Sequence, residues 1–158
     1  GRKEVMESAQ NTFISSTFWT ERIGSTAALA TLEEMWKLQS WKKITKTGNI
    51  VREGWKKLSG ENDLKIEITG IPALSSYVFQ SKKNLLYKTF IAQEMLKKGF
   101  LASTYFYACT SHKKKHIDKY FECLDPIYKI ISKSEKDQIE IKDFLDGPVC
   151  QESFKRLN

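Results

Sequence analysis

The spacing of hydrophobic residues changes in the middle of this chain, and that change restricts the fold more than any other feature of the sequence. Between Trp41 and Leu58, large apolar residues recur at steps of three and four, as on one face of a helix. Between Leu64 and Ile68 they alternate with polar residues, and Gly70-Ile71-Pro72 leads into another extended stretch from Ser75 to Gln80. The sequence therefore predicts a helix followed by an antiparallel hairpin.

Helix signals also lie on both sides of this region. Glu21 to Trp36 is rich in alanine and leucine and follows Thr20, a residue type that often caps helix N-termini. Beyond the hairpin, apolar residues between Leu85 and Leu96 predict another helix, and Gly99 is typical of a left-handed C-terminal cap. We therefore expect helices before and after the hairpin.

The remaining segments predict two strands and a final helix. Thr12 to Thr20 is rich in β-branched and aromatic residues, and Phe100 to Cys109 is also interpreted as a strand. An amphipathic helix is predicted from Ser111, and Pro126 should bend or break it. The 158 residues suit one ordinary domain, and helices mixed with an antiparallel hairpin are typical of an α+β or α/β domain.

Composition and charge exclude several classes of protein. Hydrophobic residues make up 41% of the chain and charged residues 28%, a balance typical of a globular rather than a disordered chain. No apolar run approaches the roughly 20 residues that cross a bilayer, so we expect no membrane helix. The net charge of +7 favours anionic partners, but the charges are dispersed, and nucleic-acid binding is the least favoured interpretation.

The cysteines and histidines of this chain are not spaced as in a known metal or catalytic site. Cys109, Cys123 and Cys150 are widely spaced and match no zinc pattern, which favours free thiols in a cytoplasmic protein. His112 and His116 are separated by three lysines and lack the carboxylate that would complete a metal site. We expect His112 to orient or cap a helix, the lysines to form a solvated run rather than an anion contact, and no metal to bind.

Several short segments, spread over nearly the whole chain, match the pattern of one family. They are Gly1 to Met6, Thr12 to Gly24, Ala27 to Leu32, Gly70 to Pro72, Lys98 to Leu101, Ser111-His112 and Phe154 to Asn158. This combination resembles class III aminotransferases, in particular the branch related to glutamate-1-semialdehyde 2,1-aminomutase. Those enzymes have fold type I and use pyridoxal 5′-phosphate (PLP) as their cofactor.

The resemblance implies that the chain is the C-terminal portion of such an enzyme. Residues 1–36 would form the end of the PLP-binding large domain and the linking helix. Residues 37–158 would form the C-terminal small domain, with a small, mainly antiparallel sheet covered by helices. Gly1 would lie in the middle of a longer protein and Asn158 at its natural C-terminus. The lysine that forms the Schiff base would precede Gly1, so we expect no catalytic residue in this chain and no activity from it alone.

The resemblance also assigns Ser16 and Thr17 to the cofactor. In the family, the threonine that matches Thr17 donates its hydroxyl and backbone N–H groups to the partner subunit's cofactor phosphate. The spacing alone leaves a second interpretation open, because serine and threonine before a helix often only cap it. We expect PLP in the intact enzyme, a partner that supplies the missing N-terminal portion, and a homo-oligomer. Exposed Ile23, Ala27 and Leu32 would add to the association.

The activity of the parent enzyme stays open at this point. The stretch from Ser103 to Tyr107 lacks the carboxylate that these aminomutases tend to carry in the corresponding strand. A sugar or amino-acid aminotransferase is therefore as plausible as an aminomutase. The alternative to an enzyme portion is a stand-alone anion-binding or interaction module from a split or truncated gene.

Overall fold

The computed structural model of the chain describes residues 2–12 and 21–151. The chain divides into two compact units, Gly1–Leu38 and Gln39–Asn158, and each is described by itself. This division falls close to the boundary expected after residue 36, while the assignment of the first unit to a larger domain stays a prediction. Residues 13–20, which make up most of the first predicted strand, and residues 152–158 lie outside the described residues.

The first unit contains two helices, α1 (Lys3–Ala9) and α2 (Ile23–Leu38). The Glu21 carboxylate accepts hydrogen bonds from the backbone N–H groups of Ile23 and Gly24, and it therefore caps the start of α2. The helix predicted over residues 21–36 is confirmed with slightly shifted ends. Neither helix contains a buried residue, so the apolar side chains expected to be exposed on α2 are solvent-accessible.

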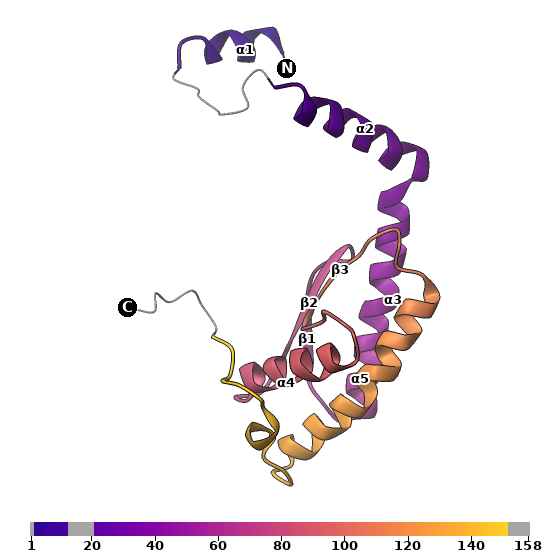
Figure 1. Cartoon of the computed structure of the whole chain (residues 1–158), viewed down its shortest axis with the longest axis vertical. Coiled ribbons are helices and arrows are strands. Elements are labelled where there is room, and N and C mark those ends of the chain that lie inside the picture. The colour runs from indigo at the N-terminus through magenta and orange to yellow at the C-terminus, as the bar shows by residue number, and fades with distance from the viewer. Residues whose placement is uncertain (1, 13–20, 152–158) are drawn as a thin grey trace. The chain divides into compact units, whose positions relative to one another are not determined.

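The second unit is an α+β fold in which helices pack on one face of a small antiparallel sheet (Figure 1). The strand order is β1-β2-β3, and both neighbouring pairs are antiparallel. This arrangement confirms the predicted α+β class and excludes the α/β alternative, which rests on parallel strands. In chain order the elements are α3 (Ser40–Glu61), β1 (Ile66–Ile71), β2 (Leu74–Phe79), α4 (Asn84–Lys97), β3 (Tyr105–Tyr107), α5 (Lys114–Glu135) and the short 3-10 helix η1 (Ile141–Phe144).

The hairpin of β1 and β2 has the predicted position, and its register places alternate residues on opposite faces of the sheet. Tyr77 is fully buried and faces the helices. Its neighbour Ser76 lies on the opposite face, where its hydroxyl oxygen is 2.9 Å from that of Thr69. Next to the turn, Gly70 of β1 has φ 80°, and a Cβ there would lie 2.3 Å from the Leu74 carbonyl oxygen, so this position requires glycine.

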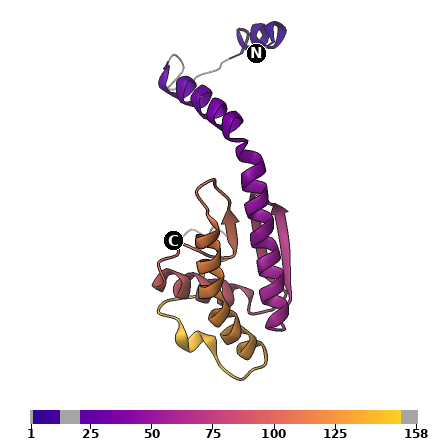
Figure 2. The same cartoon turned by 90° about the vertical axis from the view of Figure 1, so that its right-hand side faces the viewer.

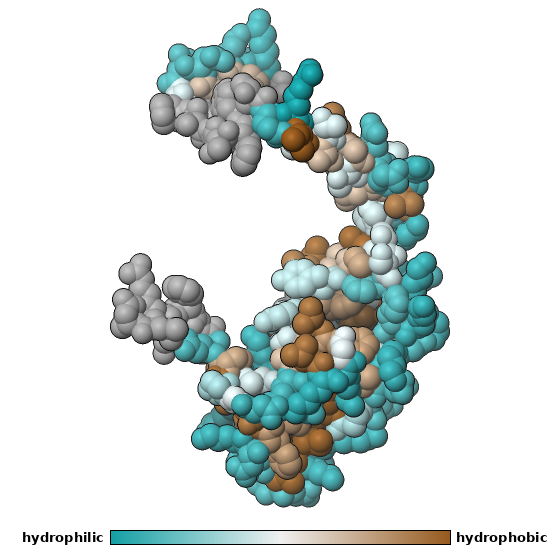
Figure 3. Space-filling view, viewed as in Figure 1, coloured by the Kyte–Doolittle hydropathy of each residue, from teal (hydrophilic) through white to brown (hydrophobic). Residues whose placement is uncertain are grey.

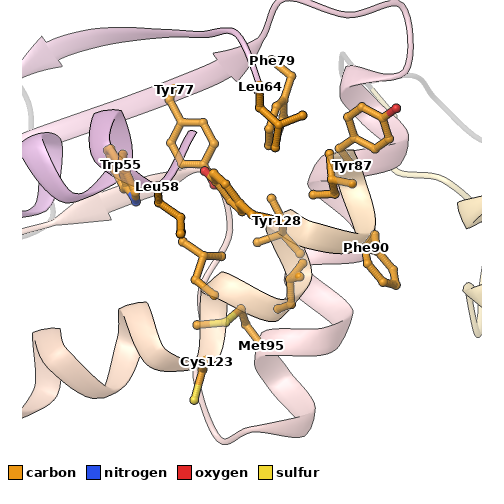
Figure 4. Packing of buried hydrophobic residues seen from close by; sticks show 14 of the residues in the cluster. Trp55, Leu58, Leu64, Tyr77, Phe79, Tyr87, Phe90, Met95, Cys123 and Tyr128 are labelled. Carbon is orange, nitrogen blue, oxygen red and sulfur yellow. The ribbon is translucent and has the colours of Figure 1, made fainter. Parts of the chain in front are cut away.

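Aromatic side chains from three helices meet the inner face of β2 in the core (Figure 4). Between ring centroids, Tyr77 lies 4.7 Å from Trp55 of α3 and 6.4 Å from Tyr128 of α5. Phe79 lies 5.4 Å from Tyr87 of α4. Because large aromatic side chains remove the most apolar surface from water, this cluster is the main stabilising contact between the sheet and its helices.

Helix α3 lies along the hairpin and approaches its turn very closely (Figure 2). A Cβ on Gly48 would be 1.7 Å from the carbonyl oxygen of Pro72, so the missing side chain lets the two backbones touch. One turn further along, Arg52 donates from Nη1 to the carbonyl oxygen of Gly70 at 2.8 Å. The helix is thereby joined to the turn by both packing and a hydrogen bond.

The predicted strand from Phe100 to Cys109 is wrong in length, because only Tyr105–Tyr107 pairs with β2. The backbone N–H of Phe100 instead donates to the carbonyl oxygen of Met95 and closes the end of α4. Gly99 has φ 81° at this point, which confirms it as the left-handed C-terminal cap. The first residues of the segment thus make hydrogen bonds to the end of α4 rather than to the sheet.

Helix α5 differs from its prediction in two ways. It begins at Lys114 rather than Ser111, because a turn in which the His112 N–H donates to the Cys109 carbonyl oxygen precedes it. It also continues through Pro126 without a break. Buried residues on both sides of the proline, including Leu124 and Ile127, hold the helix against the core and outweigh the lost hydrogen bond.

Candidate functional site

The residues predicted to bind the cofactor phosphate, Ser16 and Thr17, lie outside the described residues. Their expected setting can be examined at the adjoining helix. The first N–H groups of α2, at Ile23 and Gly24, already donate to the Glu21 carboxylate. This helix end is therefore occupied by a protein anion, and the prediction for Ser16 and Thr17 rests on their own hydroxyl and N–H groups rather than on the helix N-terminus.

The second unit contains an apolar pocket of about 580 Å³ beside β3, which we call the β3 groove. Its walls come from the C-terminal half of α4, the segment from residue 100 to 103, β3, the start of α5 and Val51 of α3. Apolar side chains reach the surface between α4 and β3 in the centre of Figure 3. The lining includes Leu96, Leu101, Phe106, Tyr107 and Ile117, and none of its residues is acidic, lysine or arginine.

Several lining residues of the β3 groove are strongly exposed for their type. Leu101 is 97% exposed, Tyr107 is 68% exposed and Leu96 is 58% exposed. Isolated apolar residues on a surface need no explanation, but a contiguous set around a pocket marks a binding surface. The groove is therefore the strongest candidate site among residues 21–151.

Two histidines stand at one side of the β3 groove. The Nδ1 atom of His112 accepts a hydrogen bond from the Cys109 N–H at 3.1 Å, and its ring lies 5.0 Å from the Phe106 ring. The Nδ1 atom of His116 accepts from the Lys113 N–H at 3.3 Å. An accepting Nδ1 places the remaining ring proton on Nε2. These bonds agree with the prediction that His112 orients the chain before a helix.

The electrostatics of His112 favour its neutral form. Burial, and to a smaller extent the neighbouring His116, lowers the pKa of His112. The imidazole is therefore uncharged at neutral pH and can donate through Nε2. The predicted lysine run beside it is exposed, and Lys114 pairs with Asp118 one turn along α5 at 2.6 Å.

The ionisable groups of the described chain do not form an acid–base or nucleophile pair at the groove. Burial raises the pKa of Tyr120, which lines the groove, so its hydroxyl stays protonated. Hydrogen bonds to Asp137, Glu94 and Glu122 raise the pKa values of Lys83, Lys97 and Lys119, respectively. A lysine that forms a Schiff base needs the opposite shift, so these three are poor nucleophiles.

Other site chemistry is also limited within the part of the chain that the structure describes. The three cysteines are free thiols, as predicted, and they occupy an exposed, a buried and an intermediate position. Within residues 2–12 and 21–151, no group of three or more His, Cys, Asp or Glu side chains could hold a metal ion. Within the same ranges, no helix is long and apolar enough to cross a membrane.

The sequence interpretation missed the β3 groove. Its walls come from five separate segments, and their approach depends on tertiary packing that a linear pattern does not contain. The apolar residues from Phe100 to Phe106 are a sequence signal for it, but their pattern predicts a strand rather than a pocket wall. Leu101 then had no reason to be singled out.

Comparison with known proteins gives a match at the level of structure. No family model matches the chain, and no curated protein matches it. The chain is similar to the solved structure of the FumI protein of Sphingopyxis sp. MTA144 in its PLP internal aldimine form, with a TM-score of 0.73 and 17% sequence identity. The likeness covers 92% of this chain and 36% of the FumI chain, so this chain spans about a third of that length. It therefore has the fold of part of a PLP-dependent protein.

Proposed function

We propose that this chain is the C-terminal portion of a PLP-dependent enzyme of the class III aminotransferase type. The observation that carries the proposal is the structural likeness to the FumI protein over 92% of this chain. The segments from Thr12 to Gly24 and from Phe154 to Asn158, which resemble the same enzyme class, point in the same direction. The activity would belong to the complete enzyme, and this chain alone would be inactive.

The described residues do not by themselves fit the cofactor. PLP stores electrons in its ring when bound, and a protein must give it an amine, an acid facing the ring nitrogen and donors for its phosphate. The lysines with shifted pKa values are held as ammonium ions by carboxylates, and the β3 groove carries no cation for a phosphate. A complementary polypeptide would therefore supply the Schiff-base lysine and the ring-nitrogen partner.

In this proposal, Ser16 and Thr17 contribute donors to the cofactor phosphate of a partner subunit. Because Glu21 already caps α2, the hydroxyl groups and the backbone N–H groups of these two residues would make the contact. The stretch from Ser103 to Tyr107, which contains β3, offers tyrosines and a serine but no carboxylate, so amino transfer is as plausible as the aminomutase reaction. The homo-oligomer belongs to the same proposal.

The proposal is tested by replacing the matching third of FumI with this chain. The fusion should bind PLP and develop the absorbance of an internal aldimine, whereas this chain alone should not. Thr17→Ala in the fusion should weaken PLP binding by about tenfold, the typical cost of losing a charge-assisted hydrogen bond or two. Thr26→Ala, on the exposed side of α2, serves as the matched control.

Two results would count against the proposal. One is a fusion that folds, by circular dichroism and gel filtration, yet shows no aldimine at saturating PLP. The other is a borohydride-trappable adduct at a single lysine of this chain alone, because that result would make it a complete PLP site.

The second candidate function, a stand-alone interaction module, is favoured by the exposed apolar lining of the β3 groove. It predicts a stable monomer that binds its partner without PLP. The two candidates are separated by whether the fusion gains the aldimine absorbance.

A further inference from the structure

We propose that the β3 groove is a docking site for an extended segment of a second polypeptide chain. The segment would add a strand to the open edge of β3 and place alternate apolar side chains in the groove. This inference goes beyond the proposed function and holds whether or not the complete protein binds PLP.

Within residues 21–151, β3 is an edge strand, so half of its backbone groups are not paired with another strand. The Tyr77 N–H donates to the Thr104 carbonyl oxygen, and the Ala108 N–H donates to the Ala73 carbonyl oxygen, both at 2.9 Å. Residues 104, 106 and 108 therefore face β2 with their backbone groups. Because these groups alternate in an antiparallel pair, the N–H and C=O groups of Tyr105 and Tyr107 point to the open edge. A polypeptide backbone is the partner that complements such a row.

Neither α4 nor α5 occupies the position of a further strand beside this edge, whereas α3 packs against β3. No Cα atom of α4 or α5 lies within 8 Å of a Cα atom of β3. Neighbouring strands need only about 4.8 Å between them. The β3 groove, of about 580 Å³, adjoins the strand, because Tyr105, Phe106 and Tyr107 are among its lining residues.

The side chains around the edge select for apolar partners. Leu101 at 97% exposure and Leu96 at 58% exposure would be covered by every second side chain of the added strand. The opposite edge of the sheet, on β1, lacks these features. There the carbonyl oxygen of Gly70 is already covered by Arg52, and no residue of β1 lines the groove.

Charge indicates which residues the docked segment carries and which occupant fits the groove. The Lys88 ammonium lies 5.2 Å from the Tyr105 ring centroid and, within residues 21–151, makes no ion pair, so acidic residues at the ends of the segment would be favoured. The same fold takes up only 36% of the FumI chain, so further polypeptide accompanies this fold there. A second copy of this chain fits less well, because pairing two β3 edges would bring the Lys88 ammonium groups of both copies to the same interface.

The test uses the purified chain and short synthetic peptides of alternating valine and threonine with glutamate at both ends. Binding is measured by fluorescence anisotropy and located by amide hydrogen exchange. Peptide binding should slow exchange of the Tyr105 and Tyr107 amides by about tenfold or more and leave those of Ile66 and Ile68, on the other open edge, unchanged. A peptide with a central proline should bind at least about tenfold more weakly.

Matched variants separate the groove from the rest of the sheet. Leu101→Glu should weaken binding by about tenfold or more, since it places a charge where an apolar side chain docks. Ile71→Glu, on the outer face of β1 and 65% exposed, should leave binding unchanged. Both positions are exposed, so both variants should fold as the parent chain does.

Three outcomes would overturn the inference. The first is that no peptide binds, or that Leu101→Glu and Ile71→Glu bind equally well. The second is that the proline peptide binds as tightly as its parent, which would reduce the site to unspecific apolar contact. The third is that the chain alone forms dimers that Leu101→Glu dissociates, which would make a second copy the occupant.

Discussion

At the scale of single residues, one carboxylate joins two helices of the second unit. Glu135, at the end of α5, accepts hydrogen bonds from the Tyr87 hydroxyl and the Ser81 hydroxyl, both at 2.5 Å. Beside it, the Lys83 ammonium donates to Asp137 and to the Ser134 carbonyl oxygen, both at 2.8 Å. Hydrogen bonds to a charged group contribute more than neutral ones, so this cluster fixes the N-terminal end of α4 against α5.

Tyr87→Phe should lower the free energy of unfolding by about 1–2 kcal/mol, because it removes a hydrogen bond to a carboxylate from a fully buried ring. The ring itself would keep its contact with Phe79. Urea unfolding, followed by circular dichroism, measures the change. Tyr107→Phe, with an exposed ring, is the matched control and should stay within about 0.5 kcal/mol of the parent chain. Equal stability of the two variants would show that the hydrogen bond from Tyr87 to Glu135 does not contribute to the free energy of unfolding.

At the scale of elements, the sequence predicted those whose burial pattern is periodic. Trp55 and Leu58 fall on the buried face of α3, and Tyr77 and Phe79 alternate into the core, so local spacing was sufficient for the helix and the hairpin. Local spacing was not sufficient where contacts between distant parts of the chain determine the secondary structure. Helix α1 buries no residue and left no periodic signal, β3 is short because Phe100 closes α4, and Pro126 is held inside α5 by its neighbours.

The closeness of α3 to the hairpin can be tested with two glycines of the same helix. Gly48→Ala should destabilise the fold by about 2–3 kcal/mol, since its Cβ would overlap the Pro72 carbonyl group, which is backbone and cannot move aside cheaply. Gly60→Ala has no atom within 4 Å of the new Cβ and should stabilise the helix by about 0.5–1 kcal/mol. Thermal and urea unfolding of both variants measure the difference. If Gly48→Ala were as stable as Gly60→Ala, α3 would not contact the turn as described.

At the scale of the whole molecule, the fold was predictable to a greater extent than the candidate site. The α+β class and the likeness to a PLP-dependent protein follow from patterns that extend along the chain. The β3 groove does not follow from such patterns, because Leu101 is recognised as part of a pocket only once the fold brings α4, β3 and α5 around it. Ser16 and Thr17 remain a prediction drawn from resemblance, since they lie outside the described residues.

The buried tyrosines give the second unit a stability that depends on pH. Burial raises the pKa values of Tyr77, Tyr120 and Tyr128 above the ordinary value of a tyrosine, and burial together with the Glu135 hydrogen bond does so for Tyr87. A pKa that is raised in the folded state favours folding below the unfolded pKa, which is about 10. Above that pH, unfolded tyrosines lose protons that the folded ones keep, so stability should fall as the pH rises.

Tyr128→Phe tests this dependence in a position where the hydroxyl can be removed at little cost. Within the described residues the Tyr128 hydroxyl is buried beside that of Tyr77 (Figure 4) and makes no hydrogen bond of normal geometry, so its removal should change stability near neutral pH only slightly. Urea unfolding at about pH 8 and about pH 11 should then show a smaller loss of stability in the variant than in the parent chain. The exposed Tyr107→Phe should follow the parent at both values. If Tyr128→Phe lost as much stability as the parent over this range, ionisation of Tyr128 would not contribute to the loss of stability in alkali.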